Sequence, residues 1–328
     1  MCRMSAKRTY EILFLVLVPL ALFLLIGELF LRVYLSRHIF YDVEMSRYAL
    51  TLKVDSPNPL VGHHHRPGAE ATLMGVSVRT NSDGFRDDEY PVEKADRKRI
   101  MFLGDSLTLG WGVEKEQAFE HILERKLEAI SPTEIINLGT GNYNTTQEVH
   151  LFIDKGLKYE PDQVVLFYFI NDAEPVPQKS RFPGLGHYRV LTFYWSRLKA
   201  LKARIWPTAG FQEYYSALYR EDNEGWVKSQ FALLKLRELS REHGFDLKVV
   251  LLPELHELSD YAFAKEHGQV TEFLHDNDIP VLDLAPFFRN ERDPRALWVA
   301  MDDAHPNARA HHLIAKYTLD FLAEKSRP

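Results

Sequence analysis

The sequence predicts a three-layer α/β/α domain with a central parallel sheet, preceded by one N-terminal transmembrane helix. Three observations lead to this prediction. An apolar run near the N-terminus is long enough to cross a bilayer. From residue 99 onward, short β-branched and aromatic runs alternate with segments of helical periodicity, as in parallel sheets covered on both faces. Polar residues directly follow several of these short runs, where such sheets bind ligands.

The composition is that of a globular protein, with 328 residues, 45% of them hydrophobic and 26% charged. The formal net charge is −6, so the chain lacks the overall basic field of nucleic-acid-binding proteins, and we expect no nucleic-acid partner. Cys2 is the single cysteine, which excludes an intramolecular disulfide and a cysteine-rich zinc site.

The N-terminal apolar run, Ile12–Leu31, contains one charged residue, Glu28. About 20 helical residues span about 30 Å, the thickness of the hydrocarbon core. Arg3, Lys7 and Arg8 precede the run, so the positive-inside rule keeps residues 1–11 in the cytoplasm. Glu28 lies near the outer end, where its carboxylate can reach the headgroups without having a functional role.

A cleaved signal peptide is the alternative interpretation of this run. Its apolar core is usually shorter and is followed by a small-x-small cleavage site, whereas Gly27–Arg32 is a poor site. We therefore expect an uncleaved signal anchor at residues 12–31. It would lie in the inner (cytoplasmic) membrane as a single pass, with the catalytic domain facing the periplasm or the outside.

Residues 32–58 are mixed and polar and predict a juxtamembrane tether, which leaves 59–328 for the domain. Residues 71–79 alternate in polarity and are followed by Asn81–Gly84, a pattern that predicts a strand and a turn. His63–His65 are consecutive, and because adjacent imidazoles point in different directions they favour a loop over a metal site. We expect no metal.

The repeating pattern predicts five strands and five helices. The strands are expected at residues 100–103, 134–138, 163–170, 247–252 and 280–284. The helices are expected at 116–130, 147–157, 228–243, 260–276 and 307–324.

The first strand is followed by Gly104-Asp105-Ser106-Leu107, which exposes a serine at a strand-to-helix turn. The segment lacks the Gly-x-Ser-x-Gly pattern of the common α/β-hydrolase nucleophile elbow. A serine nucleophile needs a base, and the base needs an orienting carboxylate. Asp302-Asp303-Ala304-His305-Pro306 precedes the last helix and offers both. We expect Asp302 to fold back from a loop and hold His305, with Asp303 pointing elsewhere.

These two segments resemble motifs of the SGNH (GDSL) hydrolase superfamily, in a membrane-anchored bacterial form. Two further blocks carry the same resemblance, which covers roughly residues 60–325. Ile136–Thr145 is similar to the family's glycine block, and Ile170-Asn171-Asp172 to its Gly-x-Asn-Asp block. The resemblance implies an SGNH, flavodoxin-like fold and ester chemistry without a cofactor. The alternative, that Ser106 and Asp302 merely cap helices, fits each motif alone but not the four together.

The resemblance implies roles for single residues. Ser106 would be the nucleophile, His305 the general base and then acid, and Asp302 the group that fixes the His305 tautomer. The oxyanion would be held by the N–H of Ser106, the side-chain amide of Asn171 and one further N–H. That N–H belongs to either Gly141 or Asn142.

Two departures from the family pattern concern the oxyanion donors. The third block has Phe169 where the family usually has glycine, so its backbone is expected to shift slightly. In the second block the family's count from the asparagine ends on Asn142, although Gly141 is the nearby glycine. Asparagine tolerates left-handed backbone angles better than most residues, so both alternatives stay open.

An insertion at residues 175–226 follows Asn171 and is far longer than most strand–helix connections. Residues 175–212 hold seven basic residues and no acidic one, so the rest of the chain carries −13. Residues 193–205 predict a basic amphipathic helix. It could pack on the domain with a solvated basic face, contact anionic headgroups, or bind an anionic polysaccharide. The candidate contact residues are Arg197, Lys199, Lys202 and Arg204.

The sequence therefore predicts a membrane-anchored serine ester hydrolase. Its expected substrate is an acylated small molecule, glycan or lipid, and an O-acetylated glycan of the cell envelope is our first choice. An O-acyltransferase with the same triad is the first alternative, and a non-catalytic surface-binding module is the second. The motifs specify neither the acyl group, nor the alcohol, nor the oligomeric state.

Overall fold

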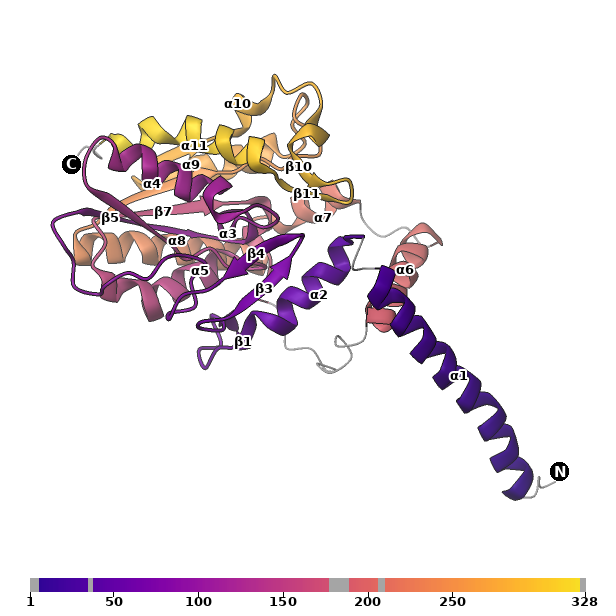
Figure 1. The fold of residues 1–328 in the computed structure, drawn as a ribbon. Coiled ribbons are helices and arrows are strands. Elements are labelled where there is room, and N and C mark those ends of the chain that lie inside the picture. Colours follow the sequence, from indigo (N-terminus) through magenta and orange to yellow (C-terminus); the bar gives the residue numbers. More distant parts are fainter. Residues whose placement is uncertain (1–5, 35–37, 177–188, 206–209, 325–328) are drawn as a thin grey trace. The chain divides into compact units, whose positions relative to one another are not determined.

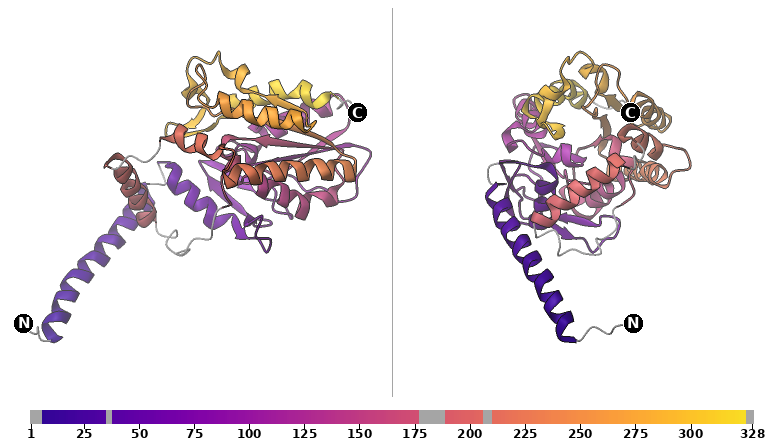
Figure 2. Two further views of the ribbon diagram at one scale, coloured as in Figure 1. Left: turned by 180° about the vertical axis from the view of Figure 1, so that it is seen from behind. Right: turned by 90° about the vertical axis from the view of Figure 1, so that its right-hand side faces the viewer.

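The structure is a computed structural model that describes residues 6–34, 38–176, 189–205 and 210–324. The chain divides into two compact units, which we describe separately (Figures 1 and 2). The first comprises Met1–Leu50 and Ser180–Pro207, and the second comprises Thr51–Lys179 and Thr208–Pro328.

The second unit is built on a five-stranded parallel sheet in the order β6-β5-β7-β8-β9. This sheet confirms the predicted fold class, and each strand lies within two residues of its expected place. The strands are β5 (Lys98–Gly104), β6 (Thr133–Asn137), β7 (Gln163–Tyr168), β8 (Asp246–Leu251) and β9 (Val281–Asp283).

Helices cover both faces of the sheet because successive strand residues point to opposite sides. Met101 and Leu166 belong to one buried cluster, whereas Phe102 and Phe167 belong to the other. Figure 1 shows the two helical layers on either side of the strands. The first cluster includes residues of α5 (Thr145–Leu151), α8 (Glu224–His243) and α9 (Ala264–Asp276), and the second includes residues of α4 (Phe119–Glu128) and α11 (Ala308–Ala323).

The strand order reverses at β5, which has β6 on one side and β7 on the other. From β5 the chain passes through α4 to β6, and from β6 through α5 past β5 to β7. Ligands of such sheets bind at this switch point, beyond the carboxyl ends of the strands. The short helix α3 (Ser106–Leu109) begins there.

The predicted helix at 147–157 is α-helical only to Leu151. It continues as a π-helical turn over Phe152–Gly156 and a 3₁₀ turn over Leu157–Tyr159. Likewise β7 ends two residues early, because Ile170–Ala173 forms a 3₁₀ turn. Both differences lie at element ends, where periodicity is least informative.

The segment predicted as a tether contains helix α2 (Tyr41–Thr51) and strand β1 (Lys53–Asp55). Strand β1 pairs with β2 (His63–His65), so the loop predicted for the three histidines is wrong. The second unit begins at Thr51 and includes this pair of strands. The single strand predicted at 71–79 is instead a hairpin of β3 (Glu70–Leu73) and β4 (Val76–Arg79), and the turn predicted at Asn81–Gly84 follows it.

The remaining elements of the second unit are short. They are helices α7 (Phe211–Leu218) and α10 (Ala285–Phe288), and the antiparallel strands β10 (Trp298–Ala300) and β11 (Asp303–Pro306).

The first unit contains the apolar helix α1 (Ala6–Tyr34) and helix α6 (Arg189–Ile205). Within α1, the 22 residues Leu13–Tyr34 are long and apolar enough to cross a membrane, and no other helix of the described residues is. Helix α6 starts four residues before the predicted one and ends where predicted.

Candidate active site

The nucleophile candidate lies at the turn from β5 into α3. The Asp105 carboxylate caps this helix by accepting a 2.8 Å hydrogen bond from the Leu107 N–H. Ser106 is the first residue of the helix and is 7% exposed. A Cβ on Gly104 would lie 2.0 Å from Thr108 Oγ1, so only glycine fits there. The turn thus holds Ser106 at the switch point of the sheet.

The structure brings Ser106 and His305 together across 199 residues of sequence, with 2.8 Å between Oγ and Nε2. On the other side of the ring, His305 Nδ1 lies 2.5 Å from Asp303 Oδ1. The nucleophile and base predicted from the sequence are therefore in contact, and the carboxylate beside the base is Asp303.

The prediction that Asp302 holds His305 is wrong. Residues 303–306 form β11, which pairs with β10, and are not the loop that was expected. In an extended strand, residues two apart share a face. Asp303 therefore points with His305, whereas Asp302 is exposed.

Asp303 is buried, and its second oxygen accepts a 2.9 Å hydrogen bond from Trp111 Nε1. Burial alone would raise the pKa of Asp303, but the hydrogen bonds and charge of His305, together with the Trp111 bond, hold that pKa below its usual range. An ionised carboxylate beside Nδ1 favours the tautomer that carries its proton on Nδ1 and leaves Nε2 as an acceptor. No sequence pattern indicated Trp111.

The second block is attached directly to α3. The buried Asn137 donates from Nδ2 to the Thr108 carbonyl at 2.8 Å and accepts from the Gly139 N–H at 2.8 Å. A Cβ on Gly139 would lie 2.3 Å from the Leu109 nitrogen, so the two backbones touch. The segments that follow β5 and β6 are therefore joined by hydrogen bonds and close backbone contact.

The two candidate oxyanion donors of this block are consecutive residues in a turn. Gly141 is buried, and its carbonyl lies 3.2 Å from His63 Nε2. Asn142 is exposed, has a left-handed φ of 63°, and accepts a 2.8 Å hydrogen bond from Lys53 Nζ on its side-chain oxygen. Lys53 and His63 come from the β1–β2 hairpin, which sequence reasoning placed outside the site.

Burial changes the ionisation of both hairpin residues. It lowers the pKa of Lys53 to about 7, and together with the nearby Lys53 charge it lowers the pKa of His63 to about 3. His63 is therefore neutral at physiological pH, whereas Lys53 titrates there.

Asn171 lies in the turn after β7, with its Nδ2 3.0 Å from Asp105 Oδ2. The preceding Phe169 has φ −123° and ψ 164°. Any residue adopts this extended conformation, so the absence of the family's glycine creates no strain. The third block thus lies beside the nucleophile turn, in the order that the motifs implied.

Three buried carboxyl groups lie behind Asn171. Burial raises the pKa of Asp105 above its usual value. Burial, followed by repulsion among the carboxylates, raises the pKa values of Glu148 and Asp172 well above theirs. The three carboxyl groups therefore share an environment that disfavours their charged forms.

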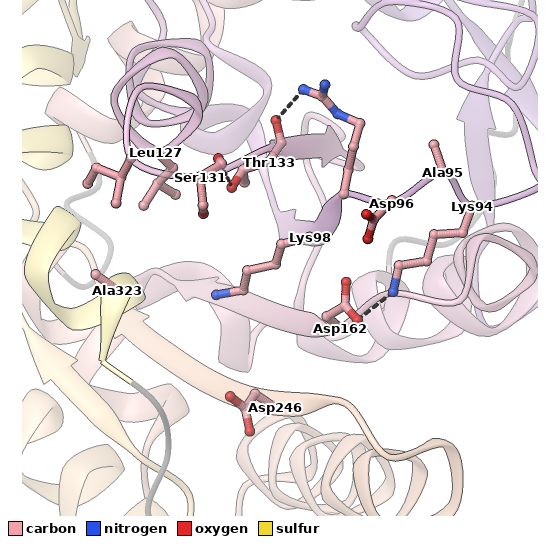
Figure 3. Close-up of a pocket in the computed structure, with 12 residues that line it drawn as sticks. Lys94, Ala95, Asp96, Lys98, Leu127, Ser131, Thr133, Asp162, Asp246 and Ala323 are labelled. Atoms are coloured by element: carbon pink, nitrogen blue, oxygen red, sulfur yellow. Dashed lines mark hydrogen bonds and ion pairs between the residues drawn. The ribbon is translucent and has the colours of Figure 1, made fainter.

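The opposite edge of the sheet contains a cavity of about 680 Å³ (Figure 3). It is lined at the amino ends of the strands by Lys98, Thr133, Asp162 and Asp246, and none of the predicted site residues reaches it. Lys94 and Asp162 form an ion pair at its rim. In the part of the chain that the structure describes, no three His, Cys, Asp or Glu side chains gather as a metal site.

The four predicted contact residues of the insertion belong to α6 in the first unit. The Arg197 guanidinium lies 5.5 Å from the Phe40 ring centroid and 5.0 Å from that of Phe193. Lys202 is exposed. The side chains of Lys199 and Arg204, and residues 177–188, lie outside the described residues.

Comparison with solved structures finds several similar folds. One is an acetyl xylan esterase (15% identity, TM-score 0.41, covering 68% of this chain and 99% of that one). Another is a lipolytic protein of the G-D-S-L family from Veillonella parvula (15%, 0.42, 70% and 100%). A third is a two-domain esterase active on acetylated mannans (18%, 0.46, 71% and 51%). Among curated proteins, nothing matches the sequence.

The family comparison covers most of the second unit. Residues 102–313 match the model of the GDSL-like lipase/acylhydrolase family. The match begins within β5 and ends within α11. It contains the Ser106, Asn171 and His305 segments, which lie together at the switch point. The chain therefore belongs to the GDSL-like lipase/acylhydrolase family and is a serine ester hydrolase.

Proposed function

We propose that Ser106, His305 and Asp303 form the catalytic triad. The observation that carries the proposal is the continuous chain of contacts from Ser106 Oγ through the imidazole to the buried Asp303 carboxylate. His305 Nε2 accepts the Oγ proton as Oγ attacks the ester carbonyl carbon. The carbon–oxygen bond to the alcohol then breaks, and His305 returns the proton to the leaving alkoxide. In the second half of the reaction, His305 accepts a proton from water, the water oxygen attacks the acyl-enzyme carbonyl, and the bond to Ser106 Oγ breaks to release the acid.

The developing oxyanion is held by N–H groups at the carboxyl edge of the sheet. The Ser106 N–H lies in the first turn of α3, where backbone N–H groups lack helical partners. The Asn171 amide has two N–H bonds, and the contact with Asp105 uses one of them. The third donor is the N–H of Gly141 or Asn142. Loss of one such donor costs about 3 kcal/mol of transition-state stabilisation.

The substrate class follows from location. The apolar helix α1 and the basic residues before it support a single-pass anchor in the inner membrane, with the hydrolase facing the periplasm or the outside. An enzyme held there meets acylated envelope glycans and lipids. The expected activity is therefore O-deacetylation of a cell-envelope or extracellular glycan, with an acylated lipid as the other substrate of this kind.

The decisive test is the Ser106→Ala variant, assayed with p-nitrophenyl acetate and acetylated glycans. It should lose at least about 10³-fold in kcat and keep its melting temperature, because only the nucleophile is removed. The matched control is Ser131→Ala, an exposed serine at the opposite edge of the sheet, which should retain full activity. Retention of more than about a tenth of the activity by Ser106→Ala would exclude Ser106 as the nucleophile.

The same assay separates hydrolysis from acyl transfer. A hydrolase releases acetate into water without an added sugar acceptor. Acetate release that depends on an acceptor, with acetylation of that acceptor, would instead identify an O-acyltransferase using the same triad.

A further inference from the structure

The single charged residue of the apolar run is buried and has partners. Glu28 is 8% exposed, and its Oε1 lies 2.9 Å from Arg32 Nε one turn later. Its Oε2 accepts a 2.9 Å hydrogen bond from the Val190 N–H, in the first turn of α6. The prediction that this carboxylate serves only to reach the headgroups therefore misses its contact with α6.

This contact joins α6 to α1 specifically. The first N–H groups of a helix lack internal partners and attract negative charge. The Glu28 carboxylate supplies such a charge within the same unit. Beside it, a Cβ on Gly27 would lie 3.3 Å from Val190 Cγ2, so the small residue lets the helices approach closely. Figure 2 shows α6 lying across the C-terminal part of α1.

The position of Glu28 in the apolar span Leu13–Tyr34 gives the depth of the Glu28–Val190 contact in the proposed membrane. Glu28 precedes Tyr34, the last residue of the apolar span, by six positions, which is about 9 Å along a helix. Helix α6 therefore begins level with the outer part of the apolar span and not beyond its end. The outer turns of α1 expose Leu29, Phe30 and Val33 at the same level.

Helix α6 also exposes a row of large apolar side chains. Tyr194, Leu198 and Leu201 follow the i, i+4, i+7 spacing of one helix side, and Trp195, which is 62% exposed, lies next to them. Val190 begins the same helix side one turn earlier and is buried against Gly27 of α1. Tyrosine and tryptophan are enriched where hydrocarbon meets headgroups, so this row has the composition of a membrane interface.

We propose that α6 is a second membrane-contact element, which lies in the outer headgroup region of the membrane that α1 crosses. Its exposed row contacts acyl chains, and Arg197 and Lys202, both exposed on α6, lie toward anionic lipid headgroups. The inference rests on the proposed membrane insertion of α1. The contact of α6 with the apolar span favours a lipid surface over an anionic polysaccharide. Sugar rings can stack on Tyr194 and Trp195, but a polysaccharide offers no apolar environment for the exposed Leu198 and Leu201.

The test uses the full-length chain in anionic phospholipid vesicles. Cys2 is the single cysteine, so Cys2→Ser provides a background for one environment-sensitive fluorophore at a time. The reporter is Leu198→Cys on α6. Leu20→Cys inside the span is the lipid control, and Phe231→Cys on α8, 68% exposed in the hydrolase unit, is the aqueous control.

The Leu198 label should emit at shorter wavelength than the Phe231 label. Lipids spin-labelled near the headgroup should quench it, and aqueous iodide should not. A Leu198 label as accessible to iodide as the Phe231 label, with the Leu20 label in lipid, would overturn the inference and leave the anchor proposal standing. A Leu20 label in water would overturn the anchor itself. Equal signals in neutral and anionic vesicles would exclude the headgroup contribution.

A matched pair of variants tests the joint between the helices. Glu28→Leu removes the acceptor for the Val190 N–H, so the Leu198 label should become accessible to iodide. Glu28→Gln keeps a side-chain oxygen and should behave as the parent. Neither variant should change cleavage of a soluble ester, because Glu28 lies outside the catalytic contacts. A Leu198 label as protected from iodide in Glu28→Leu as in the parent would show that the Glu28 side chain does not hold α6.

Discussion

The two edges of the central sheet differ in their polar groups: backbone N–H groups matter at the carboxyl edge, and buried cationic side chains bound to carbonyls matter at the amino edge. At the carboxyl edge, α3 begins at Ser106, the Asp105 carboxylate accepts a hydrogen bond from the Leu107 N–H, and the Ser106 N–H is the proposed oxyanion donor. At the amino edge, Lys248 is buried and donates to the carbonyls of Phe321 and Glu324 at the end of α11. Arg99, also buried, donates to three backbone carbonyls at the same edge.

The difference follows from the parallel fold. Every strand of the sheet runs the same way, so helices begin at the carboxyl edge and end at the amino edge. Helix starts offer N–H groups that stabilise negative charge, and helix ends offer carbonyls that stabilise cations. The carboxyl edge can therefore stabilise an oxyanion, whereas the amino edge holds buried cations whose role is structural. Substitutions at the first edge should change rates, and those at the second should change stability.

The largest expected effect is on kcat, and it should differ between the adjacent carboxylates Asp302 and Asp303. Asp303→Asn should lower kcat by about 10³- to 10⁴-fold, because an amide no longer fixes the His305 tautomer. Asp302→Asn should change kcat less than about threefold, since an exposed charge is screened by salt. Steady-state kinetics of the two variants, with melting curves as the control for folding, measure the contrast. A larger loss in Asp302→Asn would return the role to that residue.

At the amino edge, Arg99→Met should lower stability and spare activity. Arg99 is fully buried, pairs with Glu134, and donates to the carbonyls of Pro91, Val92 and Tyr159. Breaking a buried pair on one side costs about 3–5 kcal/mol. Urea unfolding should show this loss while kcat of the folded fraction stays unchanged. The double variant Arg99→Met/Glu134→Gln should recover part of the stability, because it removes the unpaired charge. A kcat loss without a stability loss would contradict the division between the edges.

A smaller effect should come from the hairpin that reaches the carboxyl edge. Lys53→Met removes the hydrogen bond that holds the Asn142 side chain and should lower kcat about tenfold, equivalent to about 1.4 kcal/mol. Adding Asn142→Gly should restore the rate, because glycine adopts the left-handed angle without an anchor. A double variant as slow as Lys53→Met would mean that Lys53 acts by another route.

The pH dependence of the parent and Lys53→Met rates tests whether the charged form of Lys53 is the one that acts. Because burial lowers the pKa of Lys53 to about 7, the charged donor is present below pH 7 and is lost above it. The ratio of parent to Lys53→Met rates should therefore fall as pH rises from 6 to 8.

The smallest effect should come from the rim of the amino-edge cavity. Lys94 and Asp162 are partly exposed, so Lys94→Met should change stability by less than about 1 kcal/mol and leave kcat unaltered. A clear loss of ester cleavage in this variant would give the cavity of Figure 3 a catalytic role and remove the contrast between the edges.

Much of the fold and part of the site were predictable from local pattern. Alternating strands and helices indicated the five-stranded sheet, a strand-to-helix turn indicated Ser106, and the family resemblance indicated Asn171. Two predictions failed because a segment expected to be a loop is a β-strand. Expecting a loop at 302–306 favoured Asp302, whereas the strand β11 selects Asp303 by its two-residue period. Expecting a loop at His63–His65 hid the β1–β2 hairpin, and with it the contacts of Lys53 and His63.

The sequence by itself determined most of the elements, the apolar N-terminal helix and the residue types of an ester hydrolase, because hydrophobic periodicity and turn chemistry act over a few residues. The tertiary structure alone decided which carboxylate holds His305, that Trp111 and Lys53 join the site, and that Glu28 binds the start of α6. Those partners lie far apart in the chain or are chosen by strand register. Which side chains meet across such distances depends on how whole helices and strands pack, and local sequence patterns do not predict that packing.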